Sequence, residues 1–456
     1  MTIKVRRILY LTFIGLFFVI TPLLILYANG YRYNLKRNRI EKTGILVVDS
    51  LPRKAQVYIN GMFKDETPAR FPRLLPDIYT LELKRSGFHS WRQEVAIESS
   101  LTTFRNDVVL FRDSLPITIV QGRIAFLTLL PNRNALLYSV MASSTQQLTI
   151  RDLSTNSETA IPASVQQATS PTSLVNFSQS GTRALLITDL DGFPHYTVLD
   201  TTTLETIDLF NITRLDFDTV EWDQASDTVL YGLRRSVLYR IDLEQKLATS
   251  IISAHITDFL GVGQTIYYTT RVGSESFLNI TQTQNPQEPI QKIKIPSPSD
   301  YQLTQSADGQ LVLLDADRMD LFVVDQATLV AQSADVSPLL SVRAKNIAFS
   351  PSGNGLLHYT DFELWTHSFE TGEAQLINRV GQQITDALFY PDKPYIIYSQ
   401  QGQIRAIEIT SAAAKNDVVL TTIQRVSDSV ISRNGDTLYF IGQVGNTEGI
   451  FSLQLR

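Results

Sequence analysis

The sequence predicts an all-β protein apart from one N-terminal transmembrane helix, with a small β-sandwich followed by a β-propeller. Three observations predict this fold. A short strand-turn-strand pattern recurs about every 40 to 48 residues from Ala125 to the C-terminus, residues 8–28 are uncharged and mostly apolar, and alternating strands fill residues 43–112. A repeat of that period indicates stacked supersecondary units, which bury their apolar faces only against one another.

Residues 8–28 predict the transmembrane helix. The twenty residues from Ile8 to Tyr27 carry no charge, and about that number of helical residues crosses the core of a bilayer. Pro22 is compatible with such a helix, because membrane helices tolerate proline kinks. A cleaved signal peptide is the alternative, since Ala28, Asn29 and Gly30 offer small residues for a peptidase. The apolar stretch is long for a signal peptide, so we expect an uncleaved anchor.

Basic residues flank the predicted helix on both sides. Residues 1–7 form a basic N-terminus, and residues 29–42 form a basic juxtamembrane segment with five cations and one acid, Glu41. The larger number of cations after the helix, taken alone, favours a cytoplasmic body under the positive-inside rule. We nevertheless expect an extracytoplasmic body, for a reason that the next domain supplies. The basic segment is then expected to lie on anionic headgroups or wall polymers.

Residues 43–112 predict a compact β-sandwich. Asn60-Gly61 is a strong hairpin signal, because both residues tolerate the positive φ angles of a tight turn. The predicted strands alternate apolar and polar residues and are separated by turn formers; they are residues 45–48, 56–59, 79–83, 93–97 and 104–110.

This domain resembles the PEGA family. The resemblance lies in residues 51–61, a proline-containing turn followed by a strand and the Asn-Gly hairpin, and continues through residues 66–69, 75–83 and 86–88. Arg53-Lys54 stands where the family has Glu-Gly, which alters only a turn. The resemblance implies a non-catalytic spacer or adhesion module of prokaryotic envelope surface proteins. It is the reason for expecting the body outside the cytoplasm.

Residues 113–456 contain eight repeat units. The clearest unit runs through Ile347, the turn Ser350-Pro351-Ser352-Gly353 and the strands that end at Tyr359 and Thr366. Each unit is expected to supply an apolar strand, a turn, an apolar and aromatic strand, and a third alternating strand. The remaining turns are residues 131–134, 178–181, 223–226, 261–263, 306–309, 390–393 and 432–435.

A closed ring is the expected arrangement of these units. Three- or four-stranded sheets of this size cannot hide both faces alone, and a propeller stacks them without exposed ends. The last unit is one strand short, so residues 115–120 are expected to complete it. Eight blades are predicted, with seven as the alternative because the unit at 256–294 has a weak turn, and an open β-solenoid is the structural competitor. The resemblance to bacterial propellers of the Tol and WD-repeat kind extends only to the fold.

Composition restricts the chemistry of the chain. The sequence has no cysteine, which excludes disulfides, cysteine-ligated metals and thiol nucleophiles. By count, 22 basic and 36 acidic residues follow residue 112. An acidic propeller argues against nucleic acid as its partner, because phosphate binding depends on basic patches.

No catalytic, metal-binding or cofactor-binding residues are assigned from the sequence. His358 and His367 flank one predicted hairpin and could meet at a metal, but no carboxylate cluster accompanies them, so ordinary strand positions are expected. Asp189 to Gly192 begins like a calcium loop yet lacks the final glutamate, so a hairpin turn is expected.

A membrane-anchored binding or scaffolding protein is the function that these features favour. In this interpretation a single-pass protein of the plasma membrane carries the propeller on a PEGA-like stalk, as a platform for an envelope protein or cell-wall glycan. A membrane-tethered propeller enzyme that acts on glycans through paired carboxylates in the central channel is one alternative. A protein-interaction hub that faces the cytoplasm is the other.

Overall fold

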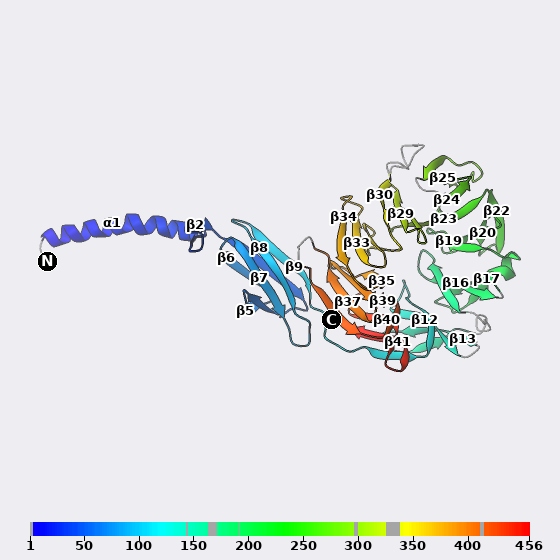
Figure 1. Ribbon diagram of the computed structural model, residues 1–456, viewed down its shortest axis with the longest axis horizontal. Helices are drawn as coiled ribbons and strands as arrows, with labels where there is room; N and C mark the ends of the chain where they lie inside the picture. Colours follow the sequence, from blue (N-terminus) through cyan, green and yellow to red (C-terminus); the bar gives the residue numbers. More distant parts are fainter. Residues whose placement is uncertain are drawn as a thin grey trace. The chain divides into compact units, whose positions relative to one another are not determined.

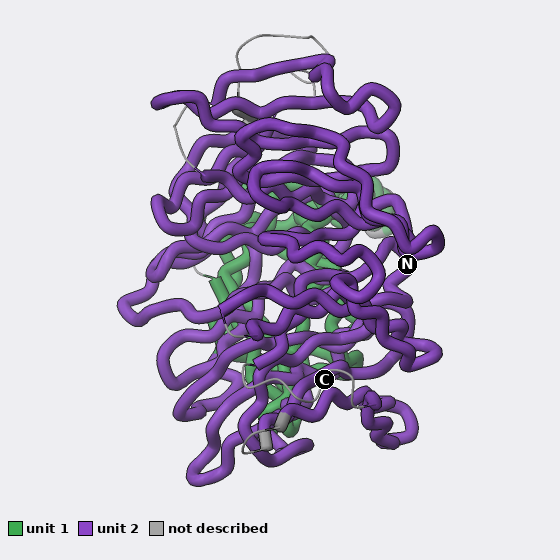
Figure 2. The backbone as a smooth tube through the Cα atoms, turned by 90° about the vertical axis from the view of Figure 1, so that its right-hand side faces the viewer, with its two compact units in different colours: residues 1–114, 410–418, 456 green, residues 115–409, 419–455 purple. Residues whose placement is uncertain are grey.

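The computed structural model describes residues 3–142, 145–162, 171–190, 192–295, 300–324, 338–410 and 415–456. Two compact units divide the chain (Figure 2). Unit 1 holds residues 1–114, 410–418 and 456, and unit 2 holds residues 115–409 and 419–455. The predicted boundary between the sandwich and the propeller, between residues 112 and 113, stays a prediction.

Unit 1 begins with a single long helix, α1 (Ile3–Ala28) (Figure 1). The stretch Leu9–Ala28 is long and apolar enough to cross a membrane, and none of it is covered by the rest of the chain. Pro22 lies inside this helix. The predicted apolar helix is therefore confirmed, and its candidate role as a membrane span rests on its length and composition.

A β-hairpin follows α1 where only a basic segment was expected. It consists of β1 (Tyr31–Asn34) and β2 (Arg39–Lys42), which pair antiparallel. Each of these strands is only four residues long and β2 carries three charges, so no alternating apolar pattern is visible in this region.

The remainder of unit 1 is a β-sandwich of two sheets. The three-stranded sheet has the order β6 (Ala69–Leu74), β3 (Gly44–Leu51), β9 (Thr102–Val109), and the four-stranded sheet has the order β5 (Met62–Glu66), β4 (Gln56–Ile59), β7 (Asp77–Lys84), β8 (Trp91–Ile97). Strand β3 alternates buried and half-buried residues along its length, as a strand with one face on a core does. Its buried side chains join those of the facing sheet in one apolar core around Leu46, Leu81 and Trp91.

The predicted Asn60-Gly61 hairpin is confirmed. Ile59 pairs with Met62 across it, and Asn60 and Gly61 have φ angles of 51° and 78°. Strands β5 and β6 were not predicted, because their residues are mostly exposed and lack an alternating apolar pattern.

In the described part of the chain, unit 2 comprises eight antiparallel four-stranded sheets, apart from the first two residues of β38, which belong to unit 1 (Figure 1). The first four are β11 (Arg123–Leu129), β12 (Ala135–Ala142), β13 (Thr145–Asp152), β14 (Glu158–Ala160); β15 (Thr172–Phe177), β16 (Arg183–Leu190), β17 (Phe193–Asp200), β18 (Thr206–Asp208); β19 (Thr219–Trp222), β20 (Val229–Arg234), β21 (Val237–Asp242), β22 (Leu247–Ser253); and β23 (Ile256–Val262), β24 (Thr265–Val272), β25 (Glu275–Gln282), β26 (Gln291–Ile295).

The other four sheets complete the propeller. They are β27 (Gln302–Gln305), β28 (Leu311–Asp315), β29 (Asp320–Val324), β30 (Pro338–Arg343); β31 (Asn346–Phe349), β32 (Gly355–Tyr359), β33 (Glu363–Ser368), β34 (Ala374–Arg379); β35 (Ile384–Phe389), β36 (Tyr395–Gln400), β37 (Gln403–Glu408), β38 (Asp417–Thr422); and β39 (Arg425–Ile431), β40 (Thr437–Val444), β41 (Thr447–Gln454), with β10 (Ile117–Gln121) beside β41. The first strands of consecutive sheets contact one another in the series β11, β15, β19, β23 and β27, and again in the series β31, β35, β39 and β11.

Serine and glycine define the turn that leads from the first to the second strand in four of the sheets. In the sixth sheet, the Gly353 N–H donates to the Ser350 carbonyl at 2.9 Å, and the Ser350 hydroxyl accepts the Gly355 N–H at 3.0 Å. Gly353 has a φ of 79°, a conformation that favours glycine. The same pair of contacts recurs in the turns at 178–183, 306–310 and 432–437.

The predicted closing strand is confirmed. Strand β10 pairs antiparallel with β41, with Ile117 opposite Ser452 and Gln121 opposite Gly449. The N-terminal strand of unit 2 thus completes the last sheet, and the predicted class, a β-sandwich followed by a β-propeller, is confirmed. The number of blades stays a prediction, although each of the eight predicted repeats corresponds to one sheet.

Two features of unit 2 differ from the sequence expectation. Each sheet has a fourth strand, which the repeat pattern did not show, because short outer strands such as β14 are exposed along their whole length. A short helix, α2 (Leu209–Thr213), follows β18, and the Asp208 side chain caps it by accepting the Asn211 N–H at 3.2 Å. Five residues are too few for helical periodicity to be visible.

Candidate functional site

Unit 2 contains a polar pocket at its first strands. The pocket has a volume of about 760 Å³ and draws residues from β15, β19, β23, β27 and β31. Its lining includes three carboxylates and no lysine, arginine or histidine. The lining residues are Val175, Asn176, Thr219, Glu221, Gln224, Thr257, Asp258, Leu260, Asp300, Tyr301, Gln302, Leu303, Thr304, Leu314, Ile347 and Phe349.

Glu221 is held in the pocket by the alternation of β19. Its neighbours Val220 and Trp222 are buried in the core, so the Glu221 side chain points to the other face of the strand. Burial, and after it the negative charge of Asp258, raises the pKa of Glu221 to about 8. The Glu221 carboxyl is therefore mainly protonated at neutral pH. Within the described residues, no hydrogen bond to this carboxyl occurs.

Asp258 is positioned by a bulge in β23, where the pairing register shifts between Ile256 and Asp258. Its Oδ2 accepts the backbone N–H of Leu303 at 2.6 Å, and Leu303 lies on β27, the first strand of the next sheet. Burial raises the pKa of Asp258 to about 6, while the N–H groups of Leu303 and Phe259 oppose this rise. The carboxylate thus joins two neighbouring sheets.

Asp386 makes the corresponding contact at another place in the propeller. It also follows a register shift, in β35, and its Oδ2 accepts the Ser429 N–H from β39 of the next sheet at 3.0 Å. Burial raises the pKa of Asp386, and the hydrogen bond from the Ser429 N–H opposes this rise. Both Asp258 and Asp386 accept a backbone N–H from the first strand of the next sheet. We therefore assign both carboxylates a structural role, which is to hold neighbouring sheets together. Within the part of the chain that the structure describes, Glu221 has no such partner.

Asp300 differs from the other two carboxylates of the pocket. Its side chain is largely exposed and lies 3.8 Å from the Arg271 guanidinium. Its charge is thus partly balanced by a cation outside the pocket lining, which leaves Glu221 and Asp258 as the two carboxyl groups of the pocket whose pKa values burial raises.

The pocket suits hydrogen bonding and cation binding. A protonated Glu221 can donate to a carbonyl or hydroxyl oxygen, and a bound cation would favour its ionised form. Among the residues that the structure describes, no group of three or more His, Cys, Asp or Glu side chains is arranged to hold a metal ion.

His358 and His367 lie together, away from this pocket. The register of β32 and β33 pairs His358 with Trp365 and His367 with Leu356, so both imidazoles share one face of the sheet. Both are about 1% exposed, and none of their four ring nitrogens has a hydrogen-bond partner in the described part of the chain. The His358 ring is stacked on the Trp365 ring, with centroids 6.3 Å apart.

The segment that begins like a calcium loop joins two strands. The Asp189 Oδ1 accepts the Gly192 N–H at 2.7 Å, between β16 and β17, which pair on either side of it. Asp191 lies outside the described residues.

The family comparison identifies the sandwich of unit 1. The model of the PEGA domain matches residues 43–112. This part of the chain is similar to the PEGA domain. The match covers the sandwich and leaves the helix, the β1–β2 hairpin and the propeller outside it. The resemblance predicted from the turn and strand motifs is thereby confirmed.

The propeller is similar in fold to solved structures with very different sequences. The crystal structure of the eukaryotic initiation factor is 13% identical with a TM-score of 0.50, covering 74% of this chain and 89% of that chain. The Dos1 propeller is 13% identical with a TM-score of 0.48, covering 75% and 96%. The β-propeller domain of Cps50 (Swd1) from Myceliophteria thermophila is 11% identical with a TM-score of 0.46, covering 75% and 100%. No curated protein matches the chain.

Glu221 and Asp258 were not singled out by the sequence analysis. Paired carboxylates in the channel were considered as a class, without assigned residues. The available signal was a carboxylate inside an apolar first strand, as in Val220-Glu221-Trp222 and Ile256-Thr257-Asp258-Phe259. Their proximity depends on the order of sheets around the propeller, which no local pattern reports.

Proposed function

We propose that this chain is a membrane-anchored, non-catalytic binding or scaffolding protein of the cell envelope. The apolar helix α1 is the anchor, the PEGA domain is the stalk, and the propeller receives the partner at the pocket around Glu221. The observation that carries the proposal is the pocket itself, which combines three carboxyl groups with hydroxyl and amide donors. Sugar hydroxyls and basic or amide side chains are the groups that such a lining recognises.

The partner is an envelope protein or a cell-wall glycan in this proposal, and the body lies outside the cytoplasm. Nucleic acid is disfavoured because the pocket lining is acidic and contains no cation. Protease treatment of intact cells tests the placement of the body. Digestion before lysis supports an extracytoplasmic body, whereas protection until lysis would establish the cytoplasmic hub in its place.

Cross-linking from the pocket tests the binding site. The sequence has no cysteine, so a photo-cross-linker can be attached at one chosen position of the full-length protein in native membranes. Thr219→Cys places it in the pocket lining, and Phe193→Cys, at an exposed position of the same unit, is the matched control. We expect a partner captured from residue 219 and not from residue 193, with the yield changed by Glu221→Gln. The same products from both positions would contradict a pocket-directed partner.

A membrane-tethered glycan-cleaving enzyme is the second candidate. Glu221 and Asp258 share a pocket, and their pKa values of about 8 and about 6 are separated as those of an acid and a base are. The hydrogen bond from Leu303 to Asp258 favours a structural role for that carboxylate. The test is whether the wild type releases reducing ends from cell-wall glycans. Release that Glu221→Gln abolishes would establish the glycan-cleaving enzyme in place of the binding protein.

A further inference from the structure

The segment that joins α1 to the PEGA domain is a stable hairpin. The Asn34 Oδ1 accepts the N–H groups of Lys36 and Arg37 at 3.0 and 3.3 Å, which fixes the turn between β1 and β2. The Asn34 Nδ2 donates to the Glu41 Oε2 at 2.6 Å, and both side chains are buried. Buried polar groups that satisfy one another in this way hold a single geometry.

This hairpin is tied to the end of α1. Only Asn29 and Gly30 separate the helix from β1, and two linking residues extend over about 10 Å at most. The Arg32 Nη1 donates to the Tyr27 carbonyl at 3.0 Å, and its guanidinium lies 3.5 Å from the centre of the Tyr27 ring. The hairpin is thereby held at the helix end. If α1 spans a bilayer, the hairpin lies in the headgroup layer, which extends about 5 to 8 Å beyond each side of the hydrocarbon core.

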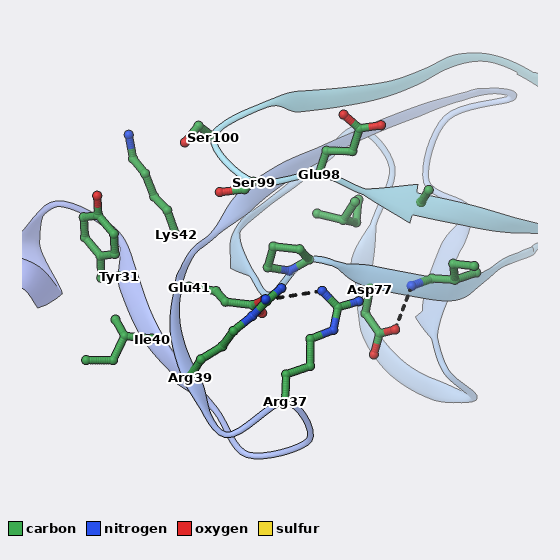
Figure 3. A pocket seen from close by; sticks show the side chains of 14 residues that line it. Tyr31, Arg37, Arg39, Ile40, Glu41, Lys42, Asp77, Glu98, Ser99 and Ser100 are labelled. Carbon is green, nitrogen blue, oxygen red and sulfur yellow. Dashed lines mark hydrogen bonds and ion pairs between the residues drawn. The ribbon is translucent and has the colours of Figure 1, made fainter.

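The two faces of the hairpin differ in polarity. Asn34 and Glu41 occupy the buried, polar face. Tyr33 pairs directly with Ile40 on the other face, where the two side chains are 53% and 54% exposed, and Leu35 beside the turn is 85% exposed. Figure 3 shows Ile40 pointing away from the Glu41 carboxylate. We call Tyr33, Leu35 and Ile40 the apolar hairpin face.

Cations lie on both faces of the hairpin. Lys42 pairs with Tyr31 on the face that carries Tyr33 and Ile40, whereas Arg39 pairs with Asn34 on the polar face. Arg37 and Arg39 both reach Glu41, and their guanidinium groups remain about half exposed. The Lys42 side chain is exposed, and within the described residues no ion pair to its ammonium occurs. These cations border a groove of about 790 Å³, which is also lined by the carboxylates of Glu41, Asp77 and Glu98 and by the hydroxyls of Ser99 and Ser100 (Figure 3). Arg39 and Lys36 neutralise Glu41 and Asp77 by ion pairs. The Lys42 ammonium, on the same face as Tyr33 and Ile40, is therefore the cation beside the apolar hairpin face that matches an anionic lipid surface.

We infer that the β1–β2 hairpin is a second membrane-binding element, whose apolar face inserts into the headgroup layer of an anionic bilayer beside α1. The inference rests on the proposed anchoring by α1 and adds a contact that anchoring does not require. Tyrosine favours the interface of a bilayer, and the adjacent Lys42 ammonium favours acidic headgroups. The bilayer is the occupant that chain connectivity brings to this face, since α1 ends three residues before β1 begins.

A single fluorescent label tests the inference in the full-length chain. Leu35→Cys carries the label on the apolar hairpin face, and Met62→Cys, 61% exposed on the Asn60-Gly61 hairpin of the PEGA domain, carries it in the matched control. Both proteins are reconstituted into vesicles of equal parts phosphatidylcholine and phosphatidylglycerol. Flotation with the vesicles measures anchoring, and quenching by aqueous iodide or by headgroup-labelled lipid measures depth. Leu35 is exposed, so its replacement removes no core contact.

We expect iodide to quench the label at residue 35 roughly threefold less than the label at residue 62, with the opposite order for the lipid quencher. In phosphatidylcholine alone, the protection at residue 35 should fall, because the Lys42 ammonium loses its counter-charge. Flotation with equal quenching at both positions would overturn the inference while leaving the anchor intact. Loss of flotation would overturn the anchor and the inference together, and unchanged protection without phosphatidylglycerol would overturn the requirement for anionic lipid.

Discussion

Acid should destabilise the propeller through His358. This imidazole is buried beside His367, and burial, followed by the charge of His367, lowers the pKa of His358 from 6.5 to about 4. As the pH falls, His358 therefore becomes protonated at a higher pH in the unfolded chain than in the folded chain. Stability that is present above pH 6.5 is lost as the pH falls toward 4. Linkage between these two values gives a loss of about 2 kcal/mol of unfolding free energy at about pH 5.

The substitution His358→Phe isolates this effect. Phenylalanine keeps a flat ring against Trp365 and removes the two unpartnered nitrogens. We expect His358→Phe to be as stable as the wild type or more stable at about pH 7.5, and to exceed it by about a further 2 kcal/mol at about pH 5. His255→Phe, at an exposed histidine of the same unit, is the matched control.

Urea unfolding of the full-length chain in detergent provides the measurement. Tryptophan fluorescence follows the transition, and Trp365 reports on the sheet that contains His358. Equal losses of unfolding free energy between the two pH values in the wild type and in His358→Phe would refute the assignment of the acid sensitivity to this site.

Three further predictions concern the sheets of the propeller. The pKa of Glu221 is about 8 against 4.5 in the unfolded chain, so the stability that its protonated form contributes is fully present below pH 4.5 and is lost as the pH rises through 8. Linkage gives a loss of about 4 to 5 kcal/mol at about pH 8.5, so Glu221→Gln should raise the unfolding free energy by that amount there and leave it unchanged at about pH 4. An equal gain at both pH values would contradict this. Asp386→Ala should cost about 1 to 3 kcal/mol in urea unfolding by leaving the Ser429 N–H without its partner, whereas the exposed control Glu370→Ala should be neutral. Gly449→Ala would place a methyl group 1.9 Å from the Val120 carbonyl oxygen, so it should lower the unfolding free energy by about 3 kcal/mol and make β10 accessible to protease. In the control Gly381→Ala, the added methyl group meets no atom within 4 Å, so neither effect is expected.

Local signals predicted much of the fold. The Ser-x-x-Gly turns were recognisable because one serine hydroxyl and one glycine at positive φ satisfy the turn without distant residues. The closing strand followed from a different local fact, a last repeat one strand short and an unassigned strand before the first. The Asn60-Gly61 hairpin was likewise determined by two adjacent residues.

Contacts between distant segments were not predicted. The β1–β2 hairpin depends on the buried pair Asn34 and Glu41, and its four-residue strands are too short to show an alternating apolar pattern. The pocket depends on sheets that lie next to one another in the propeller, which brings Asp258 to Leu303, 45 residues away in the sequence. The sequence showed a carboxylate in each of two apolar strands, but it did not show that the strands share a pocket.

Closure of the propeller by β10 is best measured with a disulfide. Ile117 and Ser452 are direct partners across the β10–β41 pair, and directly paired strand residues lie within the Cα separation of about 4.4 to 6.8 Å that a disulfide requires. In this cysteine-free chain, Ile117→Cys with Ser452→Cys can form only one intramolecular bond. Mild oxidation should cross-link the ends of the propeller in nearly all molecules, as a mobility shift on a non-reducing gel, whereas Ile117→Cys with Phe193→Cys should stay open. Failure of the 117–452 pair to cross-link in the folded protein would contradict the closed propeller, and with it the pocket that the first strands form.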